Sequence, residues 1–377
     1  MPHVVVVGGG LTGLAVAYRL RAAAPHVGVT VLEPRLRPGG NVGTEDHDGF
    51  RIELGPNGFL DRTPHLPRLC RDLGLTDRLV AASEAARKNR YLFLDGRLRR
   101  MPRGLLGLLA SPLLSARGKW KLFTEPFRKA NPPGGDETVA DFVTRRAGKE
   151  AADLFADALV TGVQAGDPHQ LSVAGAFPRL PAMERDAGSL FRGFWRAGKG
   201  RTGPMRMWSF REGLRVLVGS LADALGPAVR TGVTVRAVYP SAGVGGWTVR
   251  GDGRDSWAAD AVVLAAPAYE QAAIVAALDA PLADDLAAIP YNRVAVVALG
   301  YREADCPVKP DGFGYIAPQR TRRDVLGVQW CSSIYPDRAP AGCVLWRALC
   351  GGVNRADVFD LSDGELVGVP LKGLDEL

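Results

Sequence analysis

A glycine-rich turn at residues 8–13 has the residue types that bind a pyrophosphate. The segment reads Gly-Gly-Gly-Leu-Thr-Gly, so Gly8, Gly10 and Gly13 form the pattern G-x-G-x-x-G. The first glycine permits a tight turn, the second lets the backbone approach phosphate oxygens, and the third lets a helix pack closely on a strand. The N-terminus of that helix presents free N–H groups and a positive dipole end to the phosphates.

Glu33 stands where such a turn needs an acid for a ribose. The apolar run 4–7 predicts a strand, the amphipathic stretch 14–20 predicts a helix, and 28–32 predicts a second strand that ends at Glu33. In dinucleotide-binding βαβ units an acid about 20 residues beyond the glycines binds a ribose hydroxyl. The order of these elements therefore predicts a unit that holds the ADP half of FAD or NAD(P).

The bulk composition is that of a globular enzyme. A chain of 377 residues is long enough for two domains with a large core. The five cysteines include no C-x-x-C pair and the five histidines no H-x-x-x-H pair, so we expect reduced thiols and no metal site. No basic–aromatic pattern of a nucleic-acid module is present, and no apolar run reaches the ~18 residues of a membrane span. We expect neither a nucleic-acid partner nor a signal peptide.

The pattern beyond Glu33 predicts further helices and two groups of strands. Thr63 followed by proline predicts a helix to about residue 72 with Thr63 as its N-cap, and Asp95-Gly96 predicts a hairpin with a type I′ turn. Further helices are expected at 77–86, 136–147, 149–160 and 210–225, with a basic loop at 187–207. Strands are expected at 234–239 and 247–251 as a pair, at 260–267 as a buried parallel strand, at 294–299, and at 313–317, 325–329 and 344–350 as antiparallel strands of a second sheet.

The apolar run 104–114 has two interpretations. Arginines precede it, and Arg117, Lys119, Trp120 and Lys121 follow it. A short apolar stretch with basic and tryptophan flanks suits a segment at a membrane interface. A buried pair of helices around Pro112 fits the pattern equally well, since periodicity does not separate the two.

A second glycine motif and several later segments resemble one family of flavoproteins. Residues 37–40, Arg-Pro-Gly-Gly, resemble the second glycine motif of monoamine-oxidase-like flavoproteins, which a nicotinamide enzyme does not need. Residues 48–60 resemble the segment under the flavin ring of the protoporphyrinogen oxidase and coproporphyrinogen III oxidase family. The segments 88–91, 165–167, 171–173, 312–314, 335–338 and 351–352 follow in the family's order, so the resemblance covers residues 3–355.

The resemblance implies a fold, a cofactor and a reaction. It implies an α/β protein with a Rossmann-like FAD-binding domain (1–86 and 207–270), an antiparallel-sheet substrate domain (87–99 and 271–360) and a helical membrane-facing insertion (100–206). Family members oxidise a porphyrinogen to a porphyrin with FAD and O₂ and release peroxide. A cytoplasmic protein, peripheral on the inner face of the membrane, is expected; family members are often homodimers, although no interface signature is visible.

The resemblance also implies roles for individual residues. No residue is assigned as a catalytic acid or base, because the substrate's hydride passes to the flavin. Arg90 would pair with a propionate of the tetrapyrrole, although its position also suits an ordinary hairpin arginine. Val235 would meet the adenine through its backbone, Ala266 would lie beside the flavin, and the Gly162 carbonyl would face the tetrapyrrole. Ile316, Gln329 and Leu349 would line the ring pocket. The full cofactor set is Gly8, Gly10, Gly13, Glu33, Arg37, Gly40, Gly55, Pro56, Asn57, Val235 and Ala266.

The chain departs from the family pattern in ways that leave alternatives open. Asn41 stands where a basic residue often follows the double glycine, and Gln329 is polar where the pocket is usually apolar. The family's final glycine-rich segment, which caps the flavin, has no counterpart, so a C-terminally truncated chain with weak or absent flavin is expected. Protoporphyrinogen and coproporphyrinogen, which differ by two vinyl groups against two propionates, both fit as substrates. Another amine oxidase or desaturase, or an inactive remnant, are the alternatives.

Overall fold

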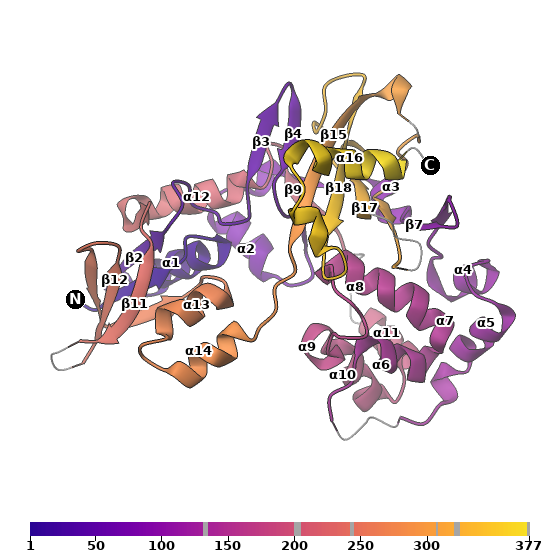
Figure 1. Cartoon of the computed structure of the whole chain (residues 1–377), viewed down its shortest axis with the longest axis horizontal. Helices are drawn as coiled ribbons and strands as arrows, with labels where there is room; N and C mark the ends of the chain where they lie inside the picture. The colour runs from indigo at the N-terminus through magenta and orange to yellow at the C-terminus, as the bar shows by residue number, and fades with distance from the viewer. Residues whose placement is uncertain (131–134, 200–204, 242–244, 307, 320–324, 375–377) are drawn as a thin grey trace. The chain divides into compact units, whose positions relative to one another are not determined.

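The computed structural model of this chain describes residues 1–130, 135–199, 205–241, 245–306, 308–319 and 325–374. It forms two compact units, one of Met1–Ala81 and Met207–Tyr291, the other of Ala82–Arg206 and Asn292–Leu377 (Figure 1). The predicted domains instead changed at residues 86 and 270 and set 100–206 apart. Residues 271–291 group with the first unit because Ile274 and Val275 pack against Val235 and Val249.

The first unit contains the predicted βαβ arrangement. Strand β1 (His3–Val7) leads through the glycine turn into α1 (Leu11–Ala23) and on to β2 (Gly28–Glu33). These strands form a parallel sheet in the order β10-β2-β1-β14, with β10 at Val229–Thr231 and β14 at Ala261–Leu264. The parallel strand predicted at 260–267 is therefore confirmed, and its C-terminal end lies beside the glycine turn that follows β1.

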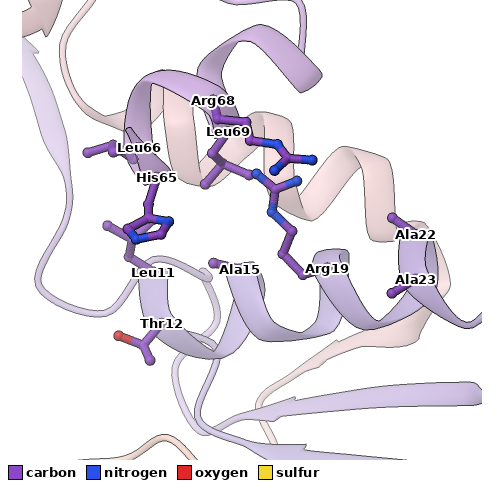
Figure 2. Close-up of a pocket in the computed structure, with 10 residues that line it drawn as sticks. All are labelled: Leu11, Thr12, Ala15, Arg19, Ala22, Ala23, His65, Leu66, Arg68 and Leu69. Carbon is purple, nitrogen blue, oxygen red and sulfur yellow. The ribbon is translucent and has the colours of Figure 1, made fainter. Parts of the chain in front are cut away.

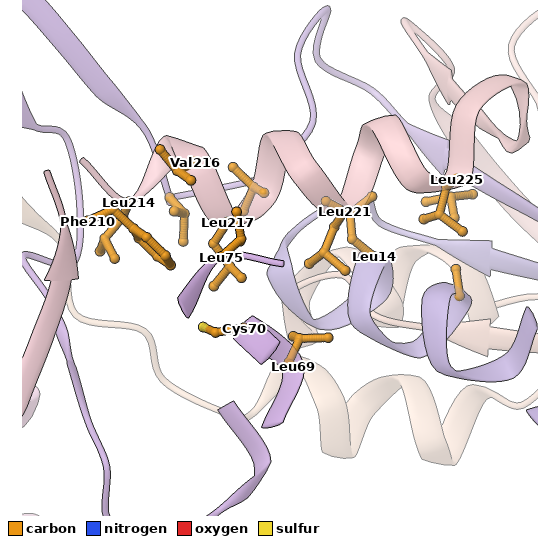
Figure 3. Packing of buried hydrophobic residues seen from close by; sticks show 14 of the residues in the cluster. Leu14, Leu69, Cys70, Leu75, Phe210, Leu214, Val216, Leu217, Leu221 and Leu225 are labelled. Atoms are coloured by element: carbon orange, nitrogen blue, oxygen red, sulfur yellow. The ribbon is translucent and has the colours of Figure 1, made fainter. Parts of the chain in front are cut away.

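Helix α12 (Arg215–Leu225) packs along α1 and closes the core of this unit. Leu217, Leu221 and Leu225 recur at helical spacing and meet Leu14 of α1 in one buried cluster (Figure 3). Burial of each such leucine stabilises the fold by about 1.5–3 kcal/mol. The helix predicted from 210 begins only at Arg215, because Met207–Phe210 forms strand β9, which pairs with β5 (Phe59–Leu60) and β6 (Leu79–Ala81).

Smaller elements complete the first unit. The strand pair predicted at 234–239 and 247–251 is confirmed as β11 (Val235–Pro240) and β12 (Trp247–Gly251), joined by β13 (Ser256–Ala259). Thr63 is not a cap, since α2 starts after Pro64, which has helical dihedrals. The helix predicted at 77–86 is wrong, because a 3₁₀ turn and β6 occupy its first half. The remaining elements are β3 (Thr44–His47), β4 (Phe50–Glu53), α2 (His65–Asp72), η1 (Thr76–Arg78), η4 (Gly226–Ala228), α13 (Ala268–Val275) and α14 (Ala280–Ala287).

The second unit is built on a six-stranded sheet in the order β15-β18-β17-β16-β7-β8. Its strands are β7 (Tyr91–Leu94), β8 (Arg97–Arg100), β15 (Val294–Arg302), β16 (Gly314–Ile316), β17 (Val325–Trp330) and β18 (Cys343–Gly351). The predicted hairpin is confirmed, because Asp95 and Gly96 both have positive φ, as a type I′ turn requires. All its pairs are antiparallel except β16 with β7, which run parallel.

The two faces of this sheet have different partners. One face carries Trp330, Trp346 and Tyr315, which pack with Val369 and Leu374 of α16 (Asp363–Leu374; Figure 1). The other face carries Leu92 and Ile316. It is covered by helices of residues 104–199, which we call the helical segment. Because side chains of a strand alternate between faces, this division assigns every second residue to the helical side.

The helical segment contains the helices predicted at 136–147 and 149–160, together with helices that were missed, namely α5, α9, α10 and α11. The predicted loop 187–207 is wrong for residues 190–199, which form α11, and its residues 200–204 lie outside the described residues. Gly188 ends α10 in a left-handed conformation, and α11 begins directly after Ser189. Its elements are α4 (Gly104–Ala110), α5 (Ala116–Phe123), η2 (Glu125–Phe127), α6 (Val139–Ala147), α7 (Lys149–Ala151), the π-helical turn η3 (Ala152–Ala156), α8 (Asp157–Gln164), α9 (Val173–Ala176), α10 (Arg179–Ala187) and α11 (Leu190–Lys199). Elsewhere in this unit lie α3 (Glu84–Lys88), α15 (Cys331–Ile334), η5 (Glu303–Asp305) and η6 (Ala356–Phe359).

The apolar run 104–114 contributes to the core of the second unit. Leu108, Leu113 and Leu114 pack with Leu92 and Leu154 in one cluster. The side chains of Leu105 and Leu106 lie outside the described residues. Among the helices of the described ranges, none has the length and apolarity needed to cross a membrane.

Candidate functional site

The glycine turn after β1 leaves no room for side chains at two of its three positions. Gly8 has a φ of +108°, and a Cβ on it would lie 2.9 Å from the backbone carbon of Ala265. A Cβ on Gly13 would lie 1.9 Å from the carbonyl oxygen of Gly8, so α1 packs directly on the turn. At Gly10, by contrast, a Cβ would meet only the Cα of Gly40, at 3.9 Å. The turn is thus packed against protein on two sides and open at Gly10.

The second glycine motif lies against the first. The amide of Gly39 donates a hydrogen bond of 2.8 Å to the carbonyl of Gly9, and Gly39 forms a parallel bridge with Gly10. Arg37 donates to the carbonyl of Val42 at 3.2 Å, which holds its guanidinium in this loop. The structure therefore brings the predicted Arg37 and Gly40 beside Gly10, although 27 residues separate Gly10 from Arg37 in the sequence.

Glu33 is buried at the end of β2 with its carboxylate turned to the glycine turn. One carboxylate oxygen accepts from the Gly9 amide at 2.8 Å and the other from the Arg35 amide at 3.0 Å. The amide of Val233 donates to the Glu33 carbonyl at 2.9 Å, which brings the start of β11 with Val235 to the same edge. An anchored carboxylate at this position suits the hydroxyls of a ribose.

Ala266 lies beside the turn, and Asn57 is another predicted cofactor residue of the same unit. Ala266 follows β14, and a Cβ on Gly8 would lie 3.0 Å from its amide nitrogen. Asn57 is buried, and neither atom of its side-chain amide has a hydrogen-bond partner in the described part of the chain. Since a buried amide without partners costs free energy, Asn57 is suited to a bound polar group.

All eleven predicted cofactor residues belong to the first unit, and they fit a dinucleotide. The glycine turn suits the phosphates, and the anchored Glu33 carboxylate suits a ribose. The unpartnered amide of Asn57 suits a polar ring. FAD would therefore be held by the residues around Gly10, Gly40, Glu33 and Asn57. No described group of three or more His, Cys, Asp and Glu side chains could hold a metal ion.

Another cavity of the first unit lies elsewhere, in a groove between α1 and α2 (Figure 2). Its volume is about 710 Å³, and Leu11, Ala15, Leu66 and Leu69 form much of its apolar wall. Arg19 crosses the groove to pair with Asp72 at 2.5 Å. None of the predicted cofactor residues lines it, so its size does not bear on the dinucleotide site.

A cavity of about 440 Å³ in the second unit collects all five predicted substrate residues. Arg90, Gly162, Ile316, Gln329 and Leu349 all line it, although up to 259 positions separate them in the sequence. Its other lining residues are Tyr91, Met101, Phe155, Ala158, Leu159, Thr161, Val163, Phe313, Gly314, Tyr315, Leu326, Gly327 and Val328. Most of these side chains are apolar, as a flat hydrophobic ligand requires.

The register of the sheet explains how distant residues meet in this cavity. Leu349, Gly327 and Ile316 are neighbours across β18, β17 and β16, and Leu92 of β7 extends the row. A second row of residues lies on the same face of the sheet, two positions further along each strand. It contains Arg347, Gln329 and Gly314, and by the same register Arg90, whose carbonyl accepts from the Met101 amide at 2.8 Å. The cavity wall is thus one apolar row and one polar row.

Helix α8 forms the opposite wall and comes closest at Gly162. A Cβ on Gly162 would lie 2.7 Å from the Cδ1 atom of Ile316, so a larger residue would push α8 from the sheet or displace that side chain. Phe155, Ala158 and Leu159 recur at helical spacing on the same wall. Their helical spacing predicts only a buried face and does not indicate that they face a cavity.

Arg90 is the cationic group of this cavity that lacks a carboxylate. Among the described residues, no acid pairs with its guanidinium, which lies 4.7 Å above the ring of Phe313. The neighbouring Arg87 and Lys88 both pair with Glu84, at 2.6 and 3.1 Å. Desolvation lowers the pKa of Arg90 from its ordinary value, yet an arginine stays protonated, so the cavity presents one uncompensated positive charge.

Comparisons with known proteins show the family of this chain. The family model described as flavin containing amine oxidoreductase matches residues 11–376. Protoporphyrinogen oxidase 1 of Arabidopsis thaliana chloroplasts is 32% identical over 96% of this chain and 72% of its own length. Coproporphyrinogen III oxidase of Bacillus subtilis is 28% identical over 100% of this chain and 83% of its own length.

The chain belongs to the protoporphyrinogen and coproporphyrinogen III oxidase family of flavin-dependent amine oxidoreductases. The prediction of this family from the sequence is confirmed, as is that of FAD as the cofactor of an oxidoreductase. A proposed protoporphyrinogen oxidase from Exiguobacterium sp. 255-15 has a TM-score of 0.84 and 25% identity, covering 100% of this chain and 82% of the other. The α/β fold of the flavin amine oxidases is thereby confirmed.

Proposed function

We propose that this chain oxidises a porphyrinogen to a porphyrin with FAD, and that O₂ accepts the electrons. The observation that carries the proposal is that Arg90, which has no carboxylate partner among the described residues, lines a mostly apolar cavity, because a tetrapyrrole is a large apolar ring with carboxylate arms. The family relatives named for protoporphyrinogen and coproporphyrinogen oxidation support it.

In this proposal the protein positions the substrate and the flavin supplies the redox chemistry. FAD, when bound, accepts a hydride from a carbon that bridges two pyrrole rings. Arg90 would fix one carboxylate, and the apolar row with Ile316 and Leu349 would hold the ring and exclude water. Gly162 would allow α8 to lie close to the ring. No side chain of the cavity is assigned as acid or base.

The direct test is an absorption and activity measurement on the purified chain. We expect added FAD to bind and to restore oxidation of protoporphyrinogen IX or coproporphyrinogen III, followed by the porphyrin Soret band and by peroxide release. Turnover of a polyamine or of a carotenoid precursor without any porphyrin would contradict the proposal. Porphyrin binding by a protein that takes up no FAD would indicate a non-catalytic relative.

Replacing Arg90 by alanine is expected to raise KM for the porphyrinogen about 10- to 100-fold while FAD binding stays unchanged. A hydrogen bond to a charged group contributes about 1.5–3 kcal/mol, and each 1.4 kcal/mol is a factor of ten. Steady-state kinetics of the FAD-loaded protein measure this change. Arg302→Ala is the control, because Arg302 is an exposed arginine of the same sheet that pairs with Asp305 at 2.6 Å. An unchanged KM in Arg90→Ala would disprove the role of Arg90.

A surface for the expected membrane contact lies on α5, η2 and α11. Trp120, Phe127 and Trp195 are 66%, 77% and 64% exposed. Phe123 and Phe194 are also exposed, and the rings of Trp120 and Phe123 lie 6.3 Å apart. The exposed cations Arg117, Lys129, Arg192 and Arg196 accompany these aromatic residues. Tryptophans among cations favour the headgroup region of anionic lipids.

The double variant Trp120→Ala/Trp195→Ala is expected to reduce binding to vesicles that contain anionic lipid by more than tenfold. Cosedimentation with phosphatidylglycerol vesicles measures the bound fraction, and phosphatidylcholine vesicles test the contribution of charge. Tyr269→Ala removes a half-exposed aromatic residue of the other unit and serves as the control. Equal cosedimentation of the double variant and the parent would reject this surface. A homodimer stays a prediction from the family resemblance.

A further inference from the structure

Gln329 is a polar side chain in the middle of the cavity wall, where no acid or base is needed. It lies on β17 opposite Gly314 of β16 on one side and Arg347 of β18 on the other. Arg347 is 1% exposed, so the sheet buries a guanidinium directly behind Gln329. Burying a charge and a polar side chain costs free energy unless both are hydrogen-bonded, so their presence in this cavity wall needs a physical reason.

The orientation of the Gln329 amide follows from its neighbour. Its Oε1 atom accepts a hydrogen bond from Nη1 of Arg347 at 3.4 Å. A guanidinium only donates, so the opposite orientation of the amide would place two donors against each other. Within the described residues no acceptor bonds the Nε2 atom, and Gln329 lines the cavity. The amide therefore presents its N–H donors to a ligand, and the cation behind it polarises them.

Gly314 separates Gln329 from Arg90 in the polar row without a side chain of its own. A Cβ on Gly314 would lie 2.0 Å from the carbonyl oxygen of Val328, and its φ is +126°, so only glycine fits there. Arg90 and Gln329 lie on either side of Gly314, two strands apart. Two strand spacings correspond to about 10 Å. The polar row thus has two donor groups about 10 Å apart, with no side chain between them.

We propose that Gln329, oriented by Arg347, binds a second carboxylate arm of the substrate whose first arm pairs with Arg90. The inference rests on the proposed function and deepens it: the cavity selects tetrapyrroles with four carboxylate arms over those with two carboxylates and two vinyl groups. A vinyl group beside Nε2 would leave the amide donors unpaired, whereas a propionate satisfies them. The difference is expected to be about tenfold in affinity, the usual effect of one unpaired buried donor.

The test compares two porphyrins as stable probes of the FAD-loaded full chain. Quenching of tryptophan fluorescence gives the Kd for coproporphyrin III, with four carboxylates, and for protoporphyrin IX, with two. The parent is expected to bind coproporphyrin III about tenfold more tightly. Gln329→Leu is expected to bring the two affinities together by weakening coproporphyrin III alone. Gln329→Glu is expected to weaken coproporphyrin III further, because like charges repel.

Controls separate this inference from a structural effect and from the proposed function. Leu349→Met changes the apolar row and is expected to leave the ratio of the two affinities unchanged. Should Gln329→Leu fail to fold, Gln329→Met retains the length of the side chain and carries the same expectation. A parent without preference, or a ratio unchanged in the Gln329 variants, overturns the inference alone. A parent that binds neither porphyrin overturns the proposed function along with it.

Discussion

Gly10→Val is expected to fold like the parent protein and to bind FAD at least tenfold more weakly. A Cβ at Gly10 would contact only the Cα of Gly40 at 3.9 Å, and the φ of −69° is acceptable for any residue. The fold therefore tolerates the substitution. The added methyl groups would fill the space where the backbone of the glycine turn approaches a pyrophosphate, so the loss falls on the cofactor alone.

Two measurements separate these effects. Titration with FAD, followed by quenching of the flavin fluorescence, gives the Kd, and thermal melting monitored by circular dichroism gives the stability. Gly13→Ala is expected to fail in both, because its Cβ would lie 1.9 Å from the Gly8 carbonyl. Gly219→Ala on α12 meets nothing within 4 Å and is the matched control for a helical glycine. FAD bound equally well by Gly10→Val and the parent would reject this placement of the cofactor.

Local patterns predicted the first unit well because its chemistry lies close together in the sequence. The glycine turn, both flanking strands and Glu33 occupy 31 consecutive residues, 3–33, in which each element follows the last. The link from this turn to Arg37 and Gly40 includes the hydrogen bond from Gly39 to Gly9 and the bridge between Gly39 and Gly10. No periodicity indicates that bond, and only the family resemblance brought the two motifs together.

The second unit was harder to predict, since its cavity depends on strand register. That Arg90, Gly314 and Gln329 form one row follows from two pairings of β16. It runs parallel to β7, which lies more than 200 residues away in the sequence, and antiparallel to β17, the next strand in the chain. A sequence shows that strands exist but not which ones pair. Helix α11 was missed for another reason: its basic surface resembled a loop, although Gly188 and Ser189 are the residues that end one helix and begin the next.

The second large effect is expected in the helical segment, where Arg146→Met should lower the free energy of unfolding by about 3–5 kcal/mol. Arg146 and Glu125 are each 1% exposed and form an ion pair, and Arg146 also contacts Glu184 at 3.3 Å. Removing the cation leaves the buried Glu125 carboxylate without a charged partner, whereas Glu184 keeps its ion pair with Arg145 at 2.7 Å. Thermal melting is expected to show a Tm about 10 °C lower. Lys149→Met, which breaks an exposed pair with Asp153, is the control and should change the Tm little.

The pH dependence tests the electrostatic origin of this loss. Burial alone would raise the pKa of Glu125, but hydrogen bonds from Ser189, Leu190 and Arg146 outweigh it and hold the pKa below its usual value. The parent therefore keeps this contribution above the unfolded pKa of about 4.3 and loses it only as the pH falls through the folded value. We expect the effect of burial to dominate without Arg146 and to raise the pKa of Glu125 in the folded variant, so the variant regains stability as this carboxylate is protonated. The Tm difference from the parent should shrink between pH 8 and pH 5; a constant difference would indicate lost packing instead of an uncompensated charge.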